Sequence, residues 1–159
     1  MCLFLTKLDS GNHPKTQEYY VNHTAGELVS HNMERLKAFS SAIEGVIKSH
    51  IVKEDPVVIE GFGLWPEYIK NLNLPDIGMV WLVADETLLD KRTRRIKSFY
   101  KGASDEEKMI QNHVGRSVWY NSKVIEAVDK LDIPTVQVSD KLSAEALSIE
   151  LLNILKLNG

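Results

Sequence analysis

The residues with the clearest capacity for chemistry lie around Glu60. This carboxylate follows an apolar triplet at 57–59, and Gly61-Phe62-Gly63 comes directly after it. A carboxylate at the end of a strand can hold a magnesium-bound water or orient a substrate hydroxyl. The two glycines permit a tight turn and the close approach of a ligand. An ordinary strand end followed by a turn would explain the same residues.

A basic cluster is the second group that could act on an anion. Guanidinium groups bind phosphate oxygens bidentately and neutralise charge that develops during phosphoryl transfer. Arg92 lies four residues after Leu88 and four before Ile96, which predicts that it faces the protein body, and Arg95 flanks the same stripe. Arg94 is predicted to face away. A solvated charged face is the alternative for the whole cluster, whose members are Lys91, Arg92, Arg94, Arg95, Lys97, Lys101 and, further along, Arg116.

Metal and thiol chemistry have little support in the sequence. The five histidines show no spacing typical of metal ligands, and the single cysteine, Cys2, excludes an intramolecular disulfide. We therefore expect no metal site built from protein ligands alone. Among the aromatic residues, Trp65 follows the Glu60 turn and is a candidate for lining a ligand surface, whereas Trp119 falls opposite the apolar stripe of its helix.

These residues must be positioned by segments that alternate between helical and strand-like patterns. Capping boxes at Thr24/Glu27 and Ser104/Glu107 predict the starts of two long helices, and Asp85 and Ser143 are predicted N-caps. The expected strands are 57–59, 79–83 and 135–138, and the expected helices are 24–51, 86–101, 104–131 and a final one after residue 143.

Short strands that are buried on both faces and joined by helices favour parallel pairing. We therefore expect a single α/β domain over residues 1–159, built as a three-layer sandwich with a mainly parallel sheet. Ligands of such sheets bind beyond the carboxyl ends of the strands. The turns at 60–63, 84–85 and 139–140 are the places where that rule predicts a site.

Composition limits the partners. The chain has 159 residues, 43% of them hydrophobic and 26% charged, with a formal net charge of −3. That charge favours neither nucleic acid nor anionic lipid, so we expect neither as a partner. The apolar start of the chain is interrupted at Lys7 and Asp9, which is too early for a signal peptide or a membrane span. A cytoplasmic protein is the expectation.

Four segments together resemble the small P-loop kinases, with a likeness to uncharacterised and 2-phosphoglycerate-kinase-like members. The resemblance covers most of the chain, from about His13 to Leu155, and the segments that carry it are 56–66, 80–86, 92–100 and 112–121. It implies a phosphotransferase that uses ATP and Mg²⁺ and acts on a nucleotide or another phosphorylated small molecule with a hydroxyl acceptor.

The same resemblance assigns roles to individual residues, with segment 86–121 as a lid-like helical pair. It implies catalytic roles for Glu60, Arg92, Arg95 and Arg116. It implies contact with the adenine for Ser139 and Asp140, and substrate binding for Gly61, Phe62 and Trp65.

The sequence departs from this family at the phosphate-binding loop. It contains no Gly-Lys dipeptide, and the nearest echo of Gly-x-x-x-x-Gly-Lys-Ser/Thr is Gly11 with Lys15 and Thr16. The expected fold therefore lacks the P-loop strand and helix, which leaves a gap in the sheet between the strands ending at Ile59 and Val83. Either residues 2–8 fill it as a substitute strand, or two chains join there as a homodimer.

Two functions follow from that departure. One is a kinase-like phosphotransferase, expected to be inactive as the isolated chain because the phosphate-binding loop is missing from it. The other is a non-catalytic binding or assembly module that keeps the kinase-like scaffold and an anion site.

Overall fold

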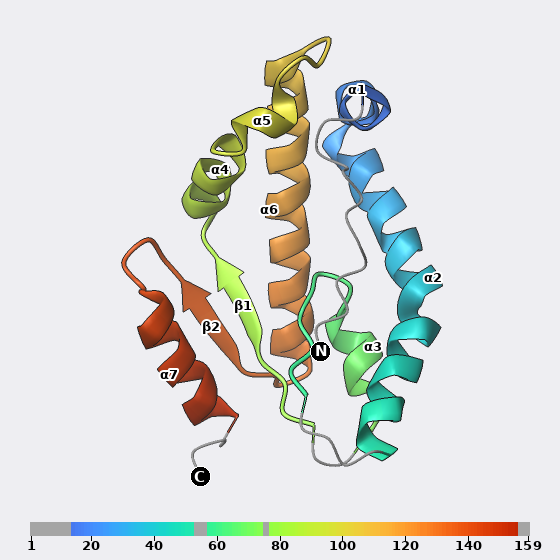
Figure 1. Cartoon of the computed structure of the whole chain (residues 1–159), viewed down its shortest axis with the longest axis vertical. Coiled ribbons are helices and arrows are strands. Elements are labelled where there is room, and N and C mark those ends of the chain that lie inside the picture. The colour runs from blue at the N-terminus through green and yellow to red at the C-terminus, as the bar shows by residue number, and fades with distance from the viewer. Residues whose placement is uncertain (1–13, 53–56, 75–76, 156–159) are drawn as a thin grey trace. The chain divides into compact units, whose positions relative to one another are not determined.

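The computed structural model describes residues 14–52, 57–74 and 77–155. Within these ranges it contains seven helices and two strands (Figure 1). In chain order they are α1 (Pro14–Asn22), α2 (Ala25–Val52), α3 (Pro66–Lys70), β1 (Trp81–Ala84), α4 (Glu86–Arg94), α5 (Lys97–Tyr100), α6 (Glu106–Lys130), β2 (Thr135–Val138) and α7 (Ala144–Ile154).

The chain forms two compact units, which we describe separately. The first unit takes in the described residues within 1–32 and 84–122, and the second takes in those within 33–83 and 123–159. The lid-like pair expected over 86–121 corresponds to α4, α5 and the part of α6 up to residue 121. These three segments belong to the first unit.

The predicted three-layer α/β sandwich is wrong. In the described residues the protein is mainly helical, and its sheet consists of β1 and β2 alone, paired in parallel. The expected strand at 57–59 forms no ladder, and Val58 is 78% exposed. β-branched residues favour extended backbone, but a strand is stable only when neighbours take its hydrogen bonds. The substitute strand expected at 2–8 lies outside the described residues.

The strand after Pro134 was predicted correctly and organises the second unit. β2 spans Thr135–Val138, with Val136 and Val138 buried and Thr135 and Gln137 exposed. Its neighbour β1 begins at Trp81 rather than at Met79, and Trp81 N donates to Pro134 O over 3.0 Å. Helix α7 lies beside β2 (Figure 1).

Three predicted helix caps are confirmed. At the start of α2, Thr24 N donates to Glu27 Oε2 over 2.8 Å, and Glu27 N donates back to Thr24 Oγ1 over 3.3 Å. Asp85 Oδ1 accepts from Leu88 N at 2.7 Å in α4, and Ser143 Oγ accepts from Ala146 N at 3.1 Å in α7. These bonds satisfy amide groups that a helix start leaves without partners.

The cap of α6 and the start of the described chain differ from expectation. Asp105 caps α6 through a 3.0 Å bond from Lys108 N, so the predicted cap at Ser104 is wrong. Ser104 instead donates from its backbone N and its hydroxyl to the Glu18 carboxylate, at 2.9 and 2.7 Å. Glu18 belongs to α1, a helix that precedes the first helix predicted from the sequence, at 24–51.

The expected helix 86–101 divides into α4 and α5. Helix α4 ends at Arg94, and Ile96 adopts φ −82° and ψ 53°, outside helical values, before α5 begins. Gly102 follows at φ 91°, a left-handed conformation that favours glycine after the end of a helix.

The inward face predicted for α6 includes a polar residue with a structural role. The Asn121 side chain accepts from Ala84 N at 3.1 Å and donates to Ala84 O at 2.8 Å. It makes both bonds that a neighbouring strand would make at that residue. Further along the same face, Val124 and Val128 are buried.

The apolar core of the first unit forms where α1, α5 and α6 meet. Val21, Tyr100 and Met109 are buried there, and Tyr20, Phe99, Ala103 and Ile110 pack against them. None of the helices in the described ranges combines the length and the apolar composition that a membrane span requires.

Candidate functional site

Buried polar side chains hold α1 against α5 and α6. The amide of Gln17, which is 4% exposed, donates from Nε2 to the carbonyl oxygens of Phe99 and Lys101, each over 3.0 Å. From α6, Asn112 Nδ2 donates to Tyr20 O over 2.9 Å. These bonds fix the backbone of α1 and so position the Tyr20 side chain over α6.

Arg116 of α6 meets Tyr20 in that position. Its Nη1 donates to the Tyr20 hydroxyl over 2.7 Å, and its Cζ lies 5.7 Å from the centre of the Tyr20 ring. Its Nε is buried and has no hydrogen-bond acceptor among the described residues. No carboxylate in the described part of the chain forms an ion pair with it. The guanidinium is always charged, so this half-buried side chain carries a positive charge without a counter-ion among those residues.

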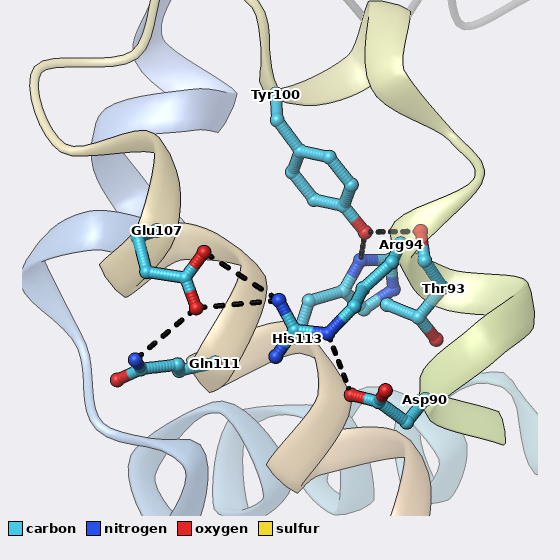
Figure 2. Close-up of polar contacts among 7 residues, drawn as sticks. All are labelled: Asp90, Thr93, Arg94, Tyr100, Glu107, Gln111 and His113. Carbon is cyan, nitrogen blue, oxygen red and sulfur yellow. Dashed lines mark hydrogen bonds and ion pairs between the residues drawn. The ribbon is translucent and has the colours of Figure 1, made fainter. Parts of the chain in front are cut away.

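Tyr100 and His113 form a second polar contact in the same core (Figure 2). The Tyr100 hydroxyl donates to Thr93 O over 3.0 Å and lies 2.8 Å from His113 Nδ1. A phenol has one proton to donate, so we infer that His113 donates from Nδ1 and keeps the lone pair on Nε2. Burial, with a smaller effect from Arg116, lowers the pKa of His113 from 6.5 to about 4.

Aromatic rings lie around Tyr20, the ring that contacts Arg116. The Tyr20 ring centre lies 5.6 Å from that of Phe99 and 5.2 Å from that of His113. Burial raises the pKa of Tyr100 to about 12, and it does the same for Tyr120. At neutral pH these phenols and the imidazole are uncharged. We call Tyr20, Phe99, Tyr100, His113 and Arg116 the Arg116 cluster.

Arg94 shows how a neighbouring arginine is neutralised. Its Nε pairs with Asp90 Oδ1 at 2.9 Å, and its Nη1 pairs with Glu107 Oε1 at 3.2 Å (Figure 2). These hydrogen bonds, the one to Asp90 first, raise the pKa of Arg94. Its side chain is 42% exposed, and its two acidic partners make it unsuitable for binding a further anion.

The other two arginines predicted to be catalytic lie on the surface. Arg92 and Arg95 are both exposed, and Arg95 is the C-cap residue of α4. The predicted inward position of Arg92 is therefore wrong. The apolar stripe used to predict it extended to Ile96, which is 47% exposed because α4 has ended before that residue.

The remaining predicted site residues belong to the second unit. Glu60, Gly61 and Phe62 are exposed, and Gly61 has φ 144°. Trp65 is 7% exposed and precedes α3, so it contributes to the core. The predicted convergence of Glu60 with Arg92 and Arg116 stays a prediction.

Ser139 and Asp140, the residues predicted to contact an adenine, follow β2. Ser139 Oγ accepts from Lys141 N at 3.3 Å, and Ser139 O accepts from Leu142 N at 3.2 Å. These bonds define a turn, and Asp140 is exposed on it.

An open cavity of about 450 Å³ lies in the second unit, next to the predicted substrate loop. Ile43 and Lys48 of α2, Tyr68 of α3 and the loop residue Gly63 are among its lining residues. A Cβ at Gly63 would lie 3.3 Å from Ile43 Cδ1, so the loop approaches α2 closely at this glycine. Among the residues described, no group of three metal-ligating side chains is placed to hold an ion.

No family model, curated protein or solved structure matches this chain. The resemblance to P-loop kinases therefore stays a prediction from the sequence. What the Arg116 cluster can do follows from its own geometry and charge.

Arg116 is the only member of this cluster that the sequence predicted as a site residue, and that prediction came from the resemblance to P-loop kinases. Tyr20 and Tyr100 were missed because α1 and α5 were not predicted as separate helices. One signal was present: His113 and Arg116 are three residues apart on one side of a predicted helix, close to its apolar stripe.

Proposed function

We propose that this chain is a non-catalytic binding module that takes a small oxyanion at Arg116. The observation that carries the proposal is the buried Nε of Arg116, a charged donor with no acceptor in the part of the chain that the structure describes. Leaving a buried charge or donor without a partner is unfavourable, and an anion at this position would supply the missing acceptor.

The neutral surroundings of Arg116 support the same proposal. A cation in a site of low dielectric attracts an anion more strongly than it would in water. Tyr20 holds Nη1 of Arg116 in place through its hydroxyl, so the guanidinium is oriented before a ligand arrives. Ordering the donors in advance reduces the entropy lost on binding.

The described cluster favours binding over catalysis. A general base works best when its pKa lies near the working pH, whereas the pKa of His113 is lowered to about 4. The five residues of the cluster include no serine, cysteine or lysine, and the hydroxyl of nearby Ser117 donates to His113 O over 2.9 Å. Phosphorylated small molecules are one class of ligand that carries an oxyanion, so the partner class predicted from the sequence is compatible with this proposal.

Nuclear magnetic resonance of the Arg116 Nε–H group tests the proposal directly. Sodium benzoate and inorganic phosphate are added in separate titrations. At least one of the two anions is expected to shift this resonance. Arg116→Gln removes the charge together with the Nε–H group, so the backbone amide resonances of α6 are followed in this variant, and binding is expected to be abolished. Arg35→Gln, which removes an exposed guanidinium from α2, serves as the matched control and is expected to bind as the unaltered chain does.

Circular dichroism must show that Arg116→Gln remains folded. Arg116→Lys, which keeps the charge but lacks the planar donor edge, provides a second variant and is expected to bind more weakly. Failure of both anions to bind at millimolar concentration, or an equal loss in Arg35→Gln, would overturn the proposal.

A further inference from the structure

The charge of the Arg116 cluster limits the charge of its ligand. Every other Lys or Arg described in α4, α5 and the first-unit part of α6 is exposed, and Arg94 is paired with Asp90 and Glu107. Burial lowers the pKa of His113 to about 4, so the imidazole is neutral at pH 7. The cluster therefore presents one positive charge at neutral pH, that of Arg116.

The geometry of Arg116 limits how the ligand is held. Its Nη1 is engaged by Tyr20 at 2.7 Å, whereas Nε lacks an acceptor. The edge formed by Nε and Nη2 carries two parallel N–H groups, which match the two oxygens of a planar carboxylate. The Tyr20 hydroxyl accepts from Arg116 and keeps its own proton, so it can donate to the same anion.

These two limits distinguish carboxylates from phosphates. A carboxylate carries one negative charge at pH 7 and neutralises Arg116. A phosphate monoester carries a charge of about −1.5 to −2 at the same pH. The excess negative charge would lie among neutral aromatic side chains, where an unpaired charge is unfavourable.

We propose, building on the oxyanion-binding function above, that the ligand of Arg116 is a monoanionic carboxylate on a small apolar body rather than a phosphate. The half-buried ring of Tyr20 lies beside the guanidinium, and the half-buried ring of Phe99 lies 5.6 Å from that of Tyr20, so both suit contact with an apolar body.

A matched pair of ligands tests this inference. Benzoate and phenyl phosphate share the same ring and differ in the anionic group. Benzoate is expected to bind about tenfold more tightly at pH 8, which corresponds to about 1.4 kcal/mol. Benzamide, which is uncharged, is the control and is expected not to bind.

The pH dependence provides a second readout. As the pH falls, phenyl phosphate takes up a proton near pH 6 and loses its second negative charge. Its affinity is therefore expected to increase from pH 8 to pH 5, whereas the affinity of benzoate is expected to stay the same. His113, Tyr100 and Tyr120 do not titrate in this range, because the pKa of His113 is about 4 and those of the two phenols are about 12, and Arg116 stays charged.

The outcomes separate the two proposals. Equal or tighter binding of phenyl phosphate at pH 8 would overturn the carboxylate preference and leave the oxyanion-binding function standing. Absence of binding by both anions would overturn both. N-acetylglutamate amide serves as a model of a carboxylate side chain from a partner protein. If this compound bound more tightly than benzoate, the assignment to a small apolar ligand would be overturned.

Discussion

Arg94 and Arg116 differ in how their charges are compensated. Arg94 has two carboxylate partners and an exposed side chain, whereas Arg116 has a phenol, neighbouring rings and a buried Nε without an acceptor. The sequence predicted that Arg92 faces the protein body, where an arginine needs an anionic partner, but in the structure Arg92 is exposed and Arg116 has the buried Nε.

His113 makes the stability of the protein sensitive to acid. Its pKa is about 4 in the folded protein against 6.5 for an ordinary histidine, and burial is the larger cause. Between these values the unfolded chain binds more protons than the folded one, so the free energy of unfolding falls as the pH falls from 6.5 to 4. We expect this residue alone to remove about 3 kcal/mol over that window.

Urea unfolding at a series of pH values measures this loss. His113→Gln removes the titrating group and is expected to flatten the pH dependence, while His50→Gln in the second unit serves as the comparison. An unchanged slope in His113→Gln would show that other groups dominate acid sensitivity. A pKa of His113 near 6.5 measured in the folded protein would contradict the premise directly.

At the scale of elements, short-range capping governs where α4 begins. Asp85 accepts from Leu88 N at 2.7 Å immediately after β1 ends at Ala84. Asp85→Ala is expected to lower the free energy of unfolding by about 1 kcal/mol, because Leu88 N loses its acceptor. Asp85→Asn keeps an acceptor oxygen and is expected to retain most of the stability.

Chemical denaturation of the two variants beside the unaltered chain provides the measurement. An equal loss in Asp85→Asn and Asp85→Ala would mean that the negative charge near the helix start matters, and that the capping bond does not.

The unpaired segment at 57–60 shows what local pattern lacks at the element scale. Its β-branched residues match those of a buried strand, but Val57 and Val58 are 40% and 78% exposed. A strand needs a partner at the right distance, and sequence composition contains no record of that partner.

For the molecule as a whole, the chain is expected to show negligible transfer of phosphate from Mg·ATP. Its 159 residues contain no Gly-Lys dipeptide, so they include no Gly-x-x-x-x-Gly-Lys-Ser/Thr loop to cradle the phosphates. A coupled assay of ADP release with small hydroxyl acceptors is the measurement. Sustained turnover that disappears in Glu60→Gln would contradict the expectation and support the role that resemblance assigns to that residue.

The predicted homodimer also stays a prediction at this scale. β2 is the only partner of β1 in the described residues, and Leu82 of β1 is 49% exposed. Sedimentation of the purified chain distinguishes a dimer from a monomer.

Local sequence determined the features that depend on neighbours in the chain. The caps at Thr24, Asp85 and Ser143, the extent of α2 and the position of β2 all follow from residues within a few positions of one another. Such contacts are set by helix and strand geometry, so their spacing in the sequence is sufficient to predict them.

Only the tertiary structure decided how many strands pair in the described residues and which arginine there has a buried Nε without an acceptor. Arg116 meets Tyr20 across 96 positions of sequence, and Gln17 meets Phe99 across 82. These contacts depend on where α1, a helix that the sequence analysis missed, docks on α5 and α6. Long-range contacts of this kind have no fixed sequence spacing, so a residue's local pattern cannot reveal its partner.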